Sequence, residues 1–428
     1  MHSFLIEGGH ALRGDVTPAG NKNAALPLLA ACVLAHEPVV LHNVPDIGDV
    51  RTMRSLLESL GVEVTPVETH TWRIHAREVR KADLDPDLCR RIRASILLAA
   101  PLLGRTGEAA LPLPGGDFIG RRRIDTHILA LQAYGVSTDL RGGTLHMRAS
   151  GPLVGAKVLL DEASVTATEN AILAAVTARG RSEIRNAASE PHVQDLCHML
   201  CALGARIENI GSNTLVVEGV DSLHGGEYTI GSDYLEVVSY IGAAAVTGGD
   251  IRIHNAASEH LEMVRLVFGR LGIVWEQEGR DLHVPATQPL EVVPDLRGAI
   301  PQISVMPWPA FPTDLMSLAI VLATQSRGTV LFHDWMFEGR MFFIDKLTAM
   351  GARIVLCDPH RCLVQGPSQL IGEQLESPDI RAGLALVMAA LAARGTSRIR
   401  NIGQIERGYE RIDEKLQAMG AKIRRVEG

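Results

Sequence analysis

The chain has 428 residues, of which 46% are hydrophobic and 21% are charged, with a formal net charge of −7. This size suffices for two or three domains, and the acidic balance argues against general nucleic-acid binding. No apolar run reaches the roughly 18 residues that span a bilayer, and the first residues lack the basic-then-apolar order of a signal peptide. The six cysteines also lack the spacing of a small secreted domain, so we expect a cytoplasmic protein without a membrane partner.

One pattern occurs six times: a short apolar strand, a polar loop and an amphipathic helix that ends in glycine. The closing glycines are Gly61, Gly135, Gly204, Gly272, Gly351 and Gly420. A period of roughly 70 residues is longer than that of solenoid repeats, so each copy predicts a subdomain. Two domains of three copies each are the simplest arrangement.

A second kind of helix is rich in alanine and aliphatic residues and carries little charge after its first turn. The chain order predicts these helices at 21–35, 91–104, 164–178, 232–248, 312–326 and 377–393. Their apolar composition predicts inner helices that are buried on nearly every side, whereas the six charged helices should lie outside. Ser, Thr, Asp or Asn near most of the starts predicts N-caps.

Two strands should join each outer helix to the next inner helix. Such hairpins are predicted at 62–76, 136–149, 205–219, 273–285 and 352–366. The sixth hairpin is split between the two chain ends, so we expect the N-terminal strand to pair with the C-terminal strand. The expected domains are then 20–230, which carries a glycine-flexed lid loop at 113–123, and 1–19 together with 231–428.

Polar and charged residues interrupt the repeat at the starts of inner helices and in the loops before outer helices. The helix starts carry Lys22, Asn23, Arg93, Ser164, Asp233, Asp314, Asp379 and Arg381, and the loops carry Asp117, Arg121, Arg122, Arg123, Glu190, Glu338, Arg340 and Arg407. A cation at a helix N-terminus opposes the helix dipole, so Lys22 and Arg93 indicate a bound anion. The alternatives are surface pairing of each cation with a carboxylate, helix capping by Asp314, and a mobile solvated loop at the lid.

Other patterns carry no cofactor signal. Cys197, His198 and Cys201 lack a second pair of metal ligands, and Cys357 and Cys362 flank a predicted hairpin turn. A phosphate-binding loop with G-x-x-x-x-G-K-[ST] and a G-x-G-x-x-G opening are both missing from the sequence. The sequence therefore predicts neither a metal nor an organic cofactor.

Seven segments are similar to those of one family, the UDP-N-acetylglucosamine enolpyruvyl transferases. They are 20–31, 91–98, 113–127, 309–316, 336–343, 377–383 and 405–421. The resemblance implies an α/β fold with two domains, each an inside-out α/β barrel of three βαβαββ-like repeats, and an active site in the cleft between them. It also implies transfer of the enolpyruvyl group of phosphoenolpyruvate to the 3′-hydroxyl of UDP-N-acetylglucosamine with release of phosphate, the first committed step of peptidoglycan synthesis.

The resemblance also implies roles for individual residues. Asp314 would be the base near the sugar hydroxyl, Asp117 on the lid would be the acid that protonates C3 of the enol, and Lys22 and Arg407 complete the catalytic set. The implied substrate-binding residues are Lys22, Asn23, Arg93, Arg122, Asp125, Ser164, Val165, Asp233, Asp314, Met336, Arg340, Asp379, Arg381 and Arg407, with Glu190 as a further candidate. The implied partners are small molecules only, and the oligomeric state stays open, a monomer included.

Three residues depart from the family pattern. Many members carry cysteine where this chain has Asp117, an Arg-Pro pair in the lid is Arg122-Arg123, and a frequent arginine is Tyr234. Without the lid thiolate the chain should be insensitive to the epoxide fosfomycin. Two alternatives remain: the same fold acting on shikimate 3-phosphate or a nucleoside, and a non-catalytic paralogue.

Overall fold

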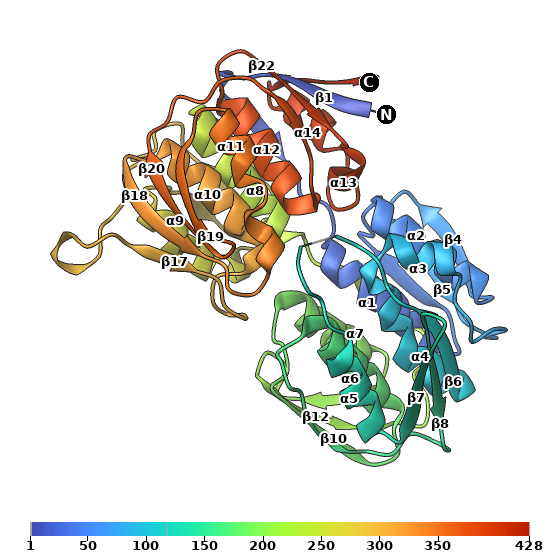
Figure 1. The fold of residues 1–428 in the computed structure, drawn as a ribbon. Coiled ribbons are helices and arrows are strands. Elements are labelled where there is room, and N and C mark those ends of the chain that lie inside the picture. The colour runs from blue at the N-terminus through green and yellow to red at the C-terminus, as the bar shows by residue number, and fades with distance from the viewer. Residues whose placement is uncertain (1, 118, 428) are drawn as a thin grey trace. The chain divides into compact units, whose positions relative to one another are not determined.

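The structure is a computed structural model that describes residues 2–117 and 119–427 (Figure 1). The described residues form two compact units. Unit 1 comprises residues 2–19, 119–121 and 232–427, and unit 2 comprises residues 20–117 and 122–231. That the units fold as independent domains with the boundaries expected above remains a prediction.

Three apolar helices that contact one another form the centre of unit 1: α8 (Tyr234–Thr247), α10 (Met316–Gln325) and α12 (Ile380–Ala392). Every residue of α12 except the last is buried, as a helix without a polar face requires. The other helical elements of this unit are α9 (Glu262–Arg270), α11 (Ile344–Ala349), α13 (Gly403–Glu406), α14 (Ile412–Ala418), η3 (Ser258–His260), η4 (Leu296–Gly298), η5 (Thr313–Leu315) and η6 (Glu338–Met341).

Three four-stranded sheets accompany these helices in unit 1. Their strand orders are β21-β22-β1-β23, β15-β16-β14-β2 and β17-β18-β20-β19. The bounds are β1 (His2–Glu7), β2 (Arg13–Val16), β14 (Asp250–Ile253), β15 (Glu276–Glu278), β16 (Asp281–Val284), β17 (Gln302–Ser304), β18 (Gly328–His333), β19 (Arg353–Asp358), β20 (Arg361–Gly366), β21 (Gln374–Glu376), β22 (Thr396–Arg400) and β23 (Lys422–Glu427). In each sheet one edge strand runs parallel to its neighbour, and the other pairs are antiparallel.

Unit 2 repeats this plan with inner helices α1 (Lys22–Ala31), α4 (Ala99–Thr106) and α6 (Val165–Thr177). The remaining helical elements are η1 (Cys32–Leu34), α2 (Gly48–Ser59), α3 (Pro86–Arg91), η2 (Arg93–Leu98), α5 (Asp125–Ala133) and α7 (Pro191–Ala202). The strands are β3 (Val39–His42), β4 (Glu63–Glu68), β5 (Thr71–His75), β6 (Glu108–Pro112), β7 (Val136–Arg141), β8 (Thr144–Ala149), β9 (Lys157–Leu159), β10 (Arg181–Arg185), β11 (Arg206–Glu208), β12 (Thr214–Glu218) and β13 (Gly226–Thr229). They form the sheets β13-β3-β5-β4, β11-β12-β10-β9 and β6-β8-β7.

The predicted hairpins are confirmed, and the predicted inner helices are buried, although the one predicted at 91–104 is an α-helix only from Ala99. The five hairpins are β4–β5, β7–β8, β11–β12, β15–β16 and β19–β20. Each unit keeps its apolar helices inside and its amphipathic helices and sheets around them, which is the inside-out α/β arrangement that the resemblance implies.

The two ends of the chain lie in one sheet, where β1 is flanked by β22 and β23 (Figure 1). Both pairings are antiparallel, and Phe4 is opposite Ile399 on one side and Arg425 on the other. Phe4 and Ile6 are fully buried in the core of unit 1. This is the pairing that the two half-hairpins predict.

The helix predicted at 91–104 is partly wrong. Residues 93–98 form the 3₁₀ helix η2, and the α-helix begins only at Ala99. The side chain of Asn170 donates to the carbonyl of Ile96 at 2.9 Å and accepts from the amide of Ala100 at 3.2 Å. These two groups would bond each other in a regular α-helix, so an inserted side chain from α6 explains the change.

Among residues 2–117 and 119–427, no helix has both the length and the apolar character that a membrane crossing requires.

A Phe4→Ala variant tests the importance of the terminal strand. We expect a loss of about 3–5 kcal/mol in the free energy of unfolding, because a fully buried aromatic ring leaves a cavity. Chemical denaturation should compare it with Leu296→Ala, whose side chain is 87% exposed. Equal stabilities of the two variants would contradict a structural role for β1.

Candidate active site

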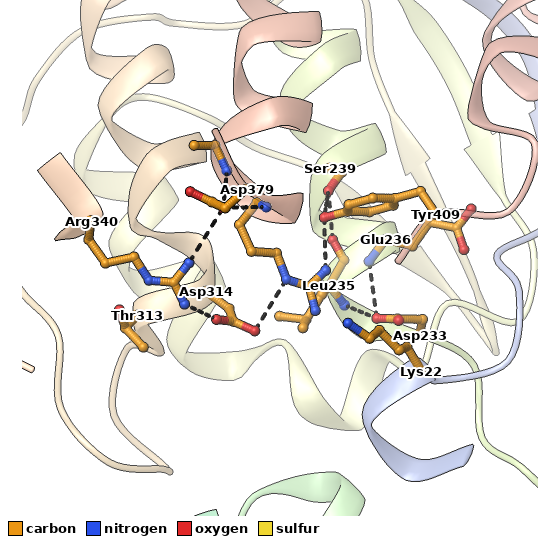
Figure 2. A network of polar contacts seen from close by, with 12 residues as sticks. Lys22, Asp233, Leu235, Glu236, Ser239, Thr313, Asp314, Arg340, Asp379 and Tyr409 are labelled. Atoms are coloured by element: carbon orange, nitrogen blue, oxygen red, sulfur yellow. Dashed lines mark hydrogen bonds and ion pairs between the residues drawn. The ribbon is translucent and has the colours of Figure 1, made fainter. Parts of the chain in front are cut away.

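Asp314 lies between two buried arginines in unit 1 (Figure 2). It belongs to η5, directly before α10, and one carboxylate oxygen accepts a hydrogen bond from Arg340. The other oxygen accepts from Nε of Arg381 at 3.2 Å. The two arginines are 8% and 6% exposed. The capping interpretation of Asp314 is therefore wrong, because its side chain bonds arginines from two other segments and the N-cap positions of η5 and α10 lack a side-chain cap.

The aspartates at the starts of α8 and α12 do cap their helices. Asp379 accepts from the amides of Arg381 and Ala382 at 2.8 and 3.0 Å. Asp233 accepts from the amides of Leu235 and Glu236 at 2.9 and 3.3 Å. Carboxylates are favoured at these positions because they satisfy free N–H groups and oppose the helix dipole.

Arg381 is fixed by an aromatic partner as well. Its Nη1 donates to the hydroxyl of Tyr409 at 3.0 Å, and the guanidinium carbon lies 5.4 Å from the centre of that ring. Burial opposes the charge of Arg381, yet Tyr409, Asp314 and Asp233 together outweigh burial and hold its pKa well above the ordinary value. The side chain therefore stays cationic.

Two neighbouring segments complete the predicted set in unit 1. Met336 is half-buried and lies in the loop before η6. Arg407 is the C-cap residue directly after α13 and donates to Oε1 of Gln404 at 2.8 Å. Tyr234 is 2% exposed and packs its ring against His260 and Trp308, with centroids 6.0 and 5.9 Å away.

The described lid residues of unit 1 contact the loop that carries Arg340. The amide of Arg121 donates to Glu338 at 3.1 Å, and the amide of Gly339 donates to the carbonyl of Ile119 at 2.9 Å. Gly120 has φ +128°, and a Cβ there would lie 2.3 Å from a Glu338 oxygen, so this turn needs glycine. Within the lid expected at 113–123, residue 118 lies outside the described residues, and Asp117 is half-buried.

Lys22 begins α1 in unit 2 and pairs with a buried carboxylate. Its Nζ lies 2.9 Å from Oδ2 of Asp49, and the two side chains are 10% and 6% exposed. Asn21 caps the helix by accepting from the amide of Ala24 at 3.0 Å, and Asn23 is half-buried. The pairing alternative thus holds for Lys22, but with a buried pair, whose desolvation is costly, rather than a surface pair.

Arg93 begins η2 and holds the chain that follows the lid. Its Nη2 donates to the carbonyls of Arg122 and Arg123 at 2.8 and 2.9 Å. Burial, reinforced by the charge of Arg122, lowers the pKa of Arg93 to about 10. Arg123 lies 2.9 Å from Asp161 and 3.3 Å from Asp125, the first residue of α5.

The other predicted residues of unit 2 lie at helix starts. Ser164 is the N-cap residue of α6 without a side-chain cap bond, and Val165 is the first helical residue. Glu190 is likewise the N-cap residue of α7 and makes no side-chain cap bond. Ser164, Val165 and Glu190 are all half-buried.

His127 is a buried neutral group beside these residues. Its Nδ1 accepts from the Asn170 amide at 2.9 Å, so Nε2 carries the proton and donates to Thr166 at 3.1 Å. Burial, together with the charge of Arg93, lowers the pKa of His127 to about 3.

Sequence reasoning missed four side chains of these clusters: Asp49, His127, Asp334 and Tyr409. Asp49 has the pattern of an ordinary acid in the first turn of a helix, and the others are single residues whose partners lie far away in the sequence. Elsewhere, Glu276, Glu278 and His283 are the described group that could hold a metal ion, but they are exposed or half-buried, and Glu278 pairs with Arg252. This group shares no residue with the predicted site.

Comparisons with known proteins identify the fold and the family of this chain. Residues 6–416 match the family model of EPSP synthase (3-phosphoshikimate 1-carboxyvinyltransferase). A crystal structure of an enolpyruvyl transferase from Streptomyces tendae is similar over 100% of this chain and 99% of its own, with a TM-score of 0.89 and 26% identity. An EPSP synthase from Acinetobacter baumannii shares the fold over the full length of both chains, with a TM-score of 0.76 and 18% identity. The fold and the family match define the class of enolpyruvyl transferases.

Curated relatives narrow this class. The chain is 56% identical to the UDP-N-acetylglucosamine 1-carboxyvinyltransferase of Bradyrhizobium diazoefficiens, with 99% of this chain and 98% of the relative covered. It is 52% identical to the enzyme of the same name from Treponema denticola, with 99% of each covered. The chain belongs to the UDP-N-acetylglucosamine 1-carboxyvinyltransferase family.

The buried neutral state of His127 predicts a loss of stability in acid. Between pH 6.5 and about 3 the unfolded histidine binds a proton and the folded one does not, so the free energy of unfolding falls as the pH falls. This group alone contributes at most about 1.4 kcal/mol for each pH unit. Denaturation at several pH values should show a shallower acid slope for His127→Gln than for the wild type, whereas the exposed control His146→Gln keeps the wild-type slope. An unchanged slope in His127→Gln would contradict the assignment.

Proposed function

We propose a division of roles among the charged residues for the reaction of this family. The chain is a transferase that moves the enolpyruvyl group of phosphoenolpyruvate to the 3′-hydroxyl of UDP-N-acetylglucosamine and releases phosphate. This is the first committed step of peptidoglycan biosynthesis. The observation that carries the proposed roles is Asp314, a carboxylate between the buried guanidinium groups of Arg340 and Arg381. Both substrates are anionic metabolites that do not cross a bilayer unaided, which supports a cytoplasmic location.

Phosphoenolpyruvate explains why so many cations are needed. It carries a phosphate and a carboxylate close together, and arginine binds both kinds of group through two parallel hydrogen bonds. Under this proposal the anions are bound by Lys22, Arg93, Arg122, Arg340 and Arg407. Lys22 and Arg340 are buried and pair with Asp49 and Asp314, so under this proposal the substrate anions share these cations with carboxylates of the protein.

Asp314 is the proposed base. Its carboxylate takes the proton of the 3′-hydroxyl as that oxygen attacks C2 of phosphoenolpyruvate. Asp117 is the proposed acid, and it donates a proton to C3, so addition gives a tetrahedral intermediate that retains the phosphate. In the second step the C2–O bond to phosphate breaks, C3 returns its proton to the Asp117 carboxylate, and the enol ether remains. The cations stabilise the charge that gathers on the leaving phosphate, and Lys22 and Arg407 are the cations to which we assign catalytic roles.

The sugar nucleotide is assigned to the remaining residues. Asn23, Asp125, Ser164, Val165 and Asp233 are its proposed contacts, with Glu190 as a further candidate, while Met336, Asp379 and Arg381 complete the substrate-binding set. Asp233 and Asp379 also cap helices, so part of each carboxylate is already occupied by backbone amides.

The alternatives are less well supported. Shikimate 3-phosphate is the substrate in the name of the matched family model, but the structural likeness to EPSP synthase at 18% identity concerns the fold alone. The relatives at 56% and 52% identity are both named for UDP-N-acetylglucosamine. A non-catalytic paralogue would be expected to lose its charged residues, and here Lys22, Arg93, Arg340 and Arg407 are all present.

An Asp314→Asn variant tests the proposed base. The purified wild type should release phosphate only when phosphoenolpyruvate and UDP-N-acetylglucosamine are both supplied, and the variant should have a kcat lower by about 10²- to 10⁴-fold because the proton acceptor is gone. Asp345→Asn, whose side chain is 74% exposed, is the matched control and should keep the wild-type kcat.

Two results would contradict the proposal in different ways. Phosphate release with shikimate 3-phosphate in place of the sugar nucleotide would favour the other acceptor. Wild-type kcat in Asp314→Asn would leave the transfer reaction in place and exclude Asp314 as its base.

We also propose that the chain belongs to the subgroup with aspartate in place of the lid cysteine. A carboxylic acid can donate the proton that C3 requires, but it is not the thiolate that an epoxide alkylates. Prolonged incubation with fosfomycin should therefore leave the wild-type activity and mass unchanged, while Asp117→Cys should gain time-dependent inactivation and the mass of one adduct. Inactivation of the wild type by a covalent adduct would refute this proposal.

A further inference from the structure

A buried carboxylate that has no role in the proposed reaction lies directly after β18. Asp334 has no exposed surface, and its Oδ1 accepts from the amides of Met336 and Phe337 at 3.1 and 3.3 Å. These two bonds stabilise the turn at 334–337, which is the start of the loop that leads to η6. Because η6 contains Arg340, Asp334 fixes the segment that presents this arginine.

The second oxygen of the same carboxylate fixes the other partner. Its Oδ2 accepts from the hydroxyl of Thr313 at 2.5 Å, and Thr313 is the residue before Asp314 in η5. One carboxylate thus bonds the segment of Asp314 and the segment of Arg340, and Figure 2 shows Thr313 beside the Asp314–Arg340 pair.

The main chain of Asp334 is held as well. Its amide donates to the carbonyl of His360 at 2.8 Å, and Nδ1 of His360 donates to the carbonyl of Asp334 at 2.7 Å. His360 lies at the turn between β19 and β20, so the carboxylate projects from a fixed point of the sheet.

A carboxylate is a costly choice for a buried structural position. Burial raises the pKa of Asp334, and the Thr313 hydroxyl, the charge of Arg340 and the two amides offset only part of this effect. An apolar residue would leave the amides of Met336 and Phe337 and the hydroxyl of Thr313 without this acceptor, so the acid is explained by the three donors that it holds in place.

We propose that Asp334, through Thr313 and the turn at Met336, is a positioning residue that sets the geometry of the Asp314–Arg340 pair. Asp334 touches no reacting atom in this scheme. The inference rests on the proposed roles of Asp314 and Arg340 and adds the residue that holds both. A shift of about 1 Å in a positioned group can lower a rate by roughly 10²-fold, so a lost hydroxyl at Thr313 should be visible in kcat.

Two substitutions at Thr313 separate the hydroxyl from the rest of the side chain. Thr313→Val removes the donor and keeps the shape, whereas Thr313→Ser keeps the donor. We expect Thr313→Val to lower kcat by about ten- to hundredfold and Thr313→Ser to remain within about threefold of the wild type. Thr324→Val is the matched control: it loses a buried hydroxyl that donates to the carbonyl of Val321 at 2.6 Å near the far end of α10, and its kcat should not change.

A background without Arg340 distinguishes positioning from general stability. If Thr313 acts through the Asp314–Arg340 pair, Thr313→Val should lower kcat by a much smaller factor in an Arg340→Ala protein than in the wild type. If the effect were purely structural, Thr313→Val would lower kcat by the same factor in the Arg340→Ala protein and in the wild type. Should Thr313→Val fail to fold, Asp334→Asn serves instead, because the Asn oxygen still accepts from the amides of Met336 and Phe337 while its NH2 group replaces the oxygen that accepts from Thr313.

The outcomes are distinguishable. Equal kcat in Thr313→Val and Thr313→Ser, or an equal factor in both backgrounds, overturns the positioning role while the wild type still releases phosphate with UDP-N-acetylglucosamine. Absence of that release in the wild type would instead overturn the proposed function, and this inference with it.

Discussion

The structure depends on inner helices that are apolar on every side. Each of α8, α10 and α12 is buried along almost its whole length, as are α1 and α6. Such helices leave little room for charged groups along their length, and the charged residues of the candidate site lie mainly near their ends. The N-terminal ends are the better choice for binding anions, because free N–H groups and the positive end of the dipole meet there. This constraint explains why the charged residues of the candidate site recur at helix starts in both units.

The three acids at the inner-helix starts of unit 1 divide into two kinds. Asp233 and Asp379 hold their own helix amides, so their carboxylates are partly satisfied by the backbone. Asp314 instead faces two guanidinium groups from distant segments. The difference is local: η5 separates Asp314 from the first turn of α10, and Thr313 next to it is held by Asp334. Asp314 is thus the acid of the three whose described hydrogen-bond partners are other side chains rather than the amides of its own helix.

Repetition made the fold predictable from the sequence, while the site was predictable only in part. The hairpins and the buried helices follow from composition and turn residues, and both are confirmed. The helix predicted at 91–104 was partly wrong because Asn170, 70 residues downstream of Ala100, bonds the carbonyl of Ile96 and the amide of Ala100 in place of the helix hydrogen bond between them. The capping interpretation of Asp314 failed for a related reason, since its arginine partners come from other segments. Asp49, Asp334 and Tyr409 have no local signal, and the roles assigned to the site residues remain proposals.

The position of β1 has a consequence for synthesis on the ribosome. This strand is made first, yet its neighbours in the sheet are β22 and β23, and β23 ends at Glu427. At about 5–20 residues per second, more than 400 residues separate the two events by roughly 20 to 80 seconds. During that time Phe4 and Ile6 have no sheet to join, while residues 122–231 can already pack with 20–117. The sheet that holds β1 can therefore close only after β22 and β23 have been made, and a nascent chain has to keep β1 from other partners until then.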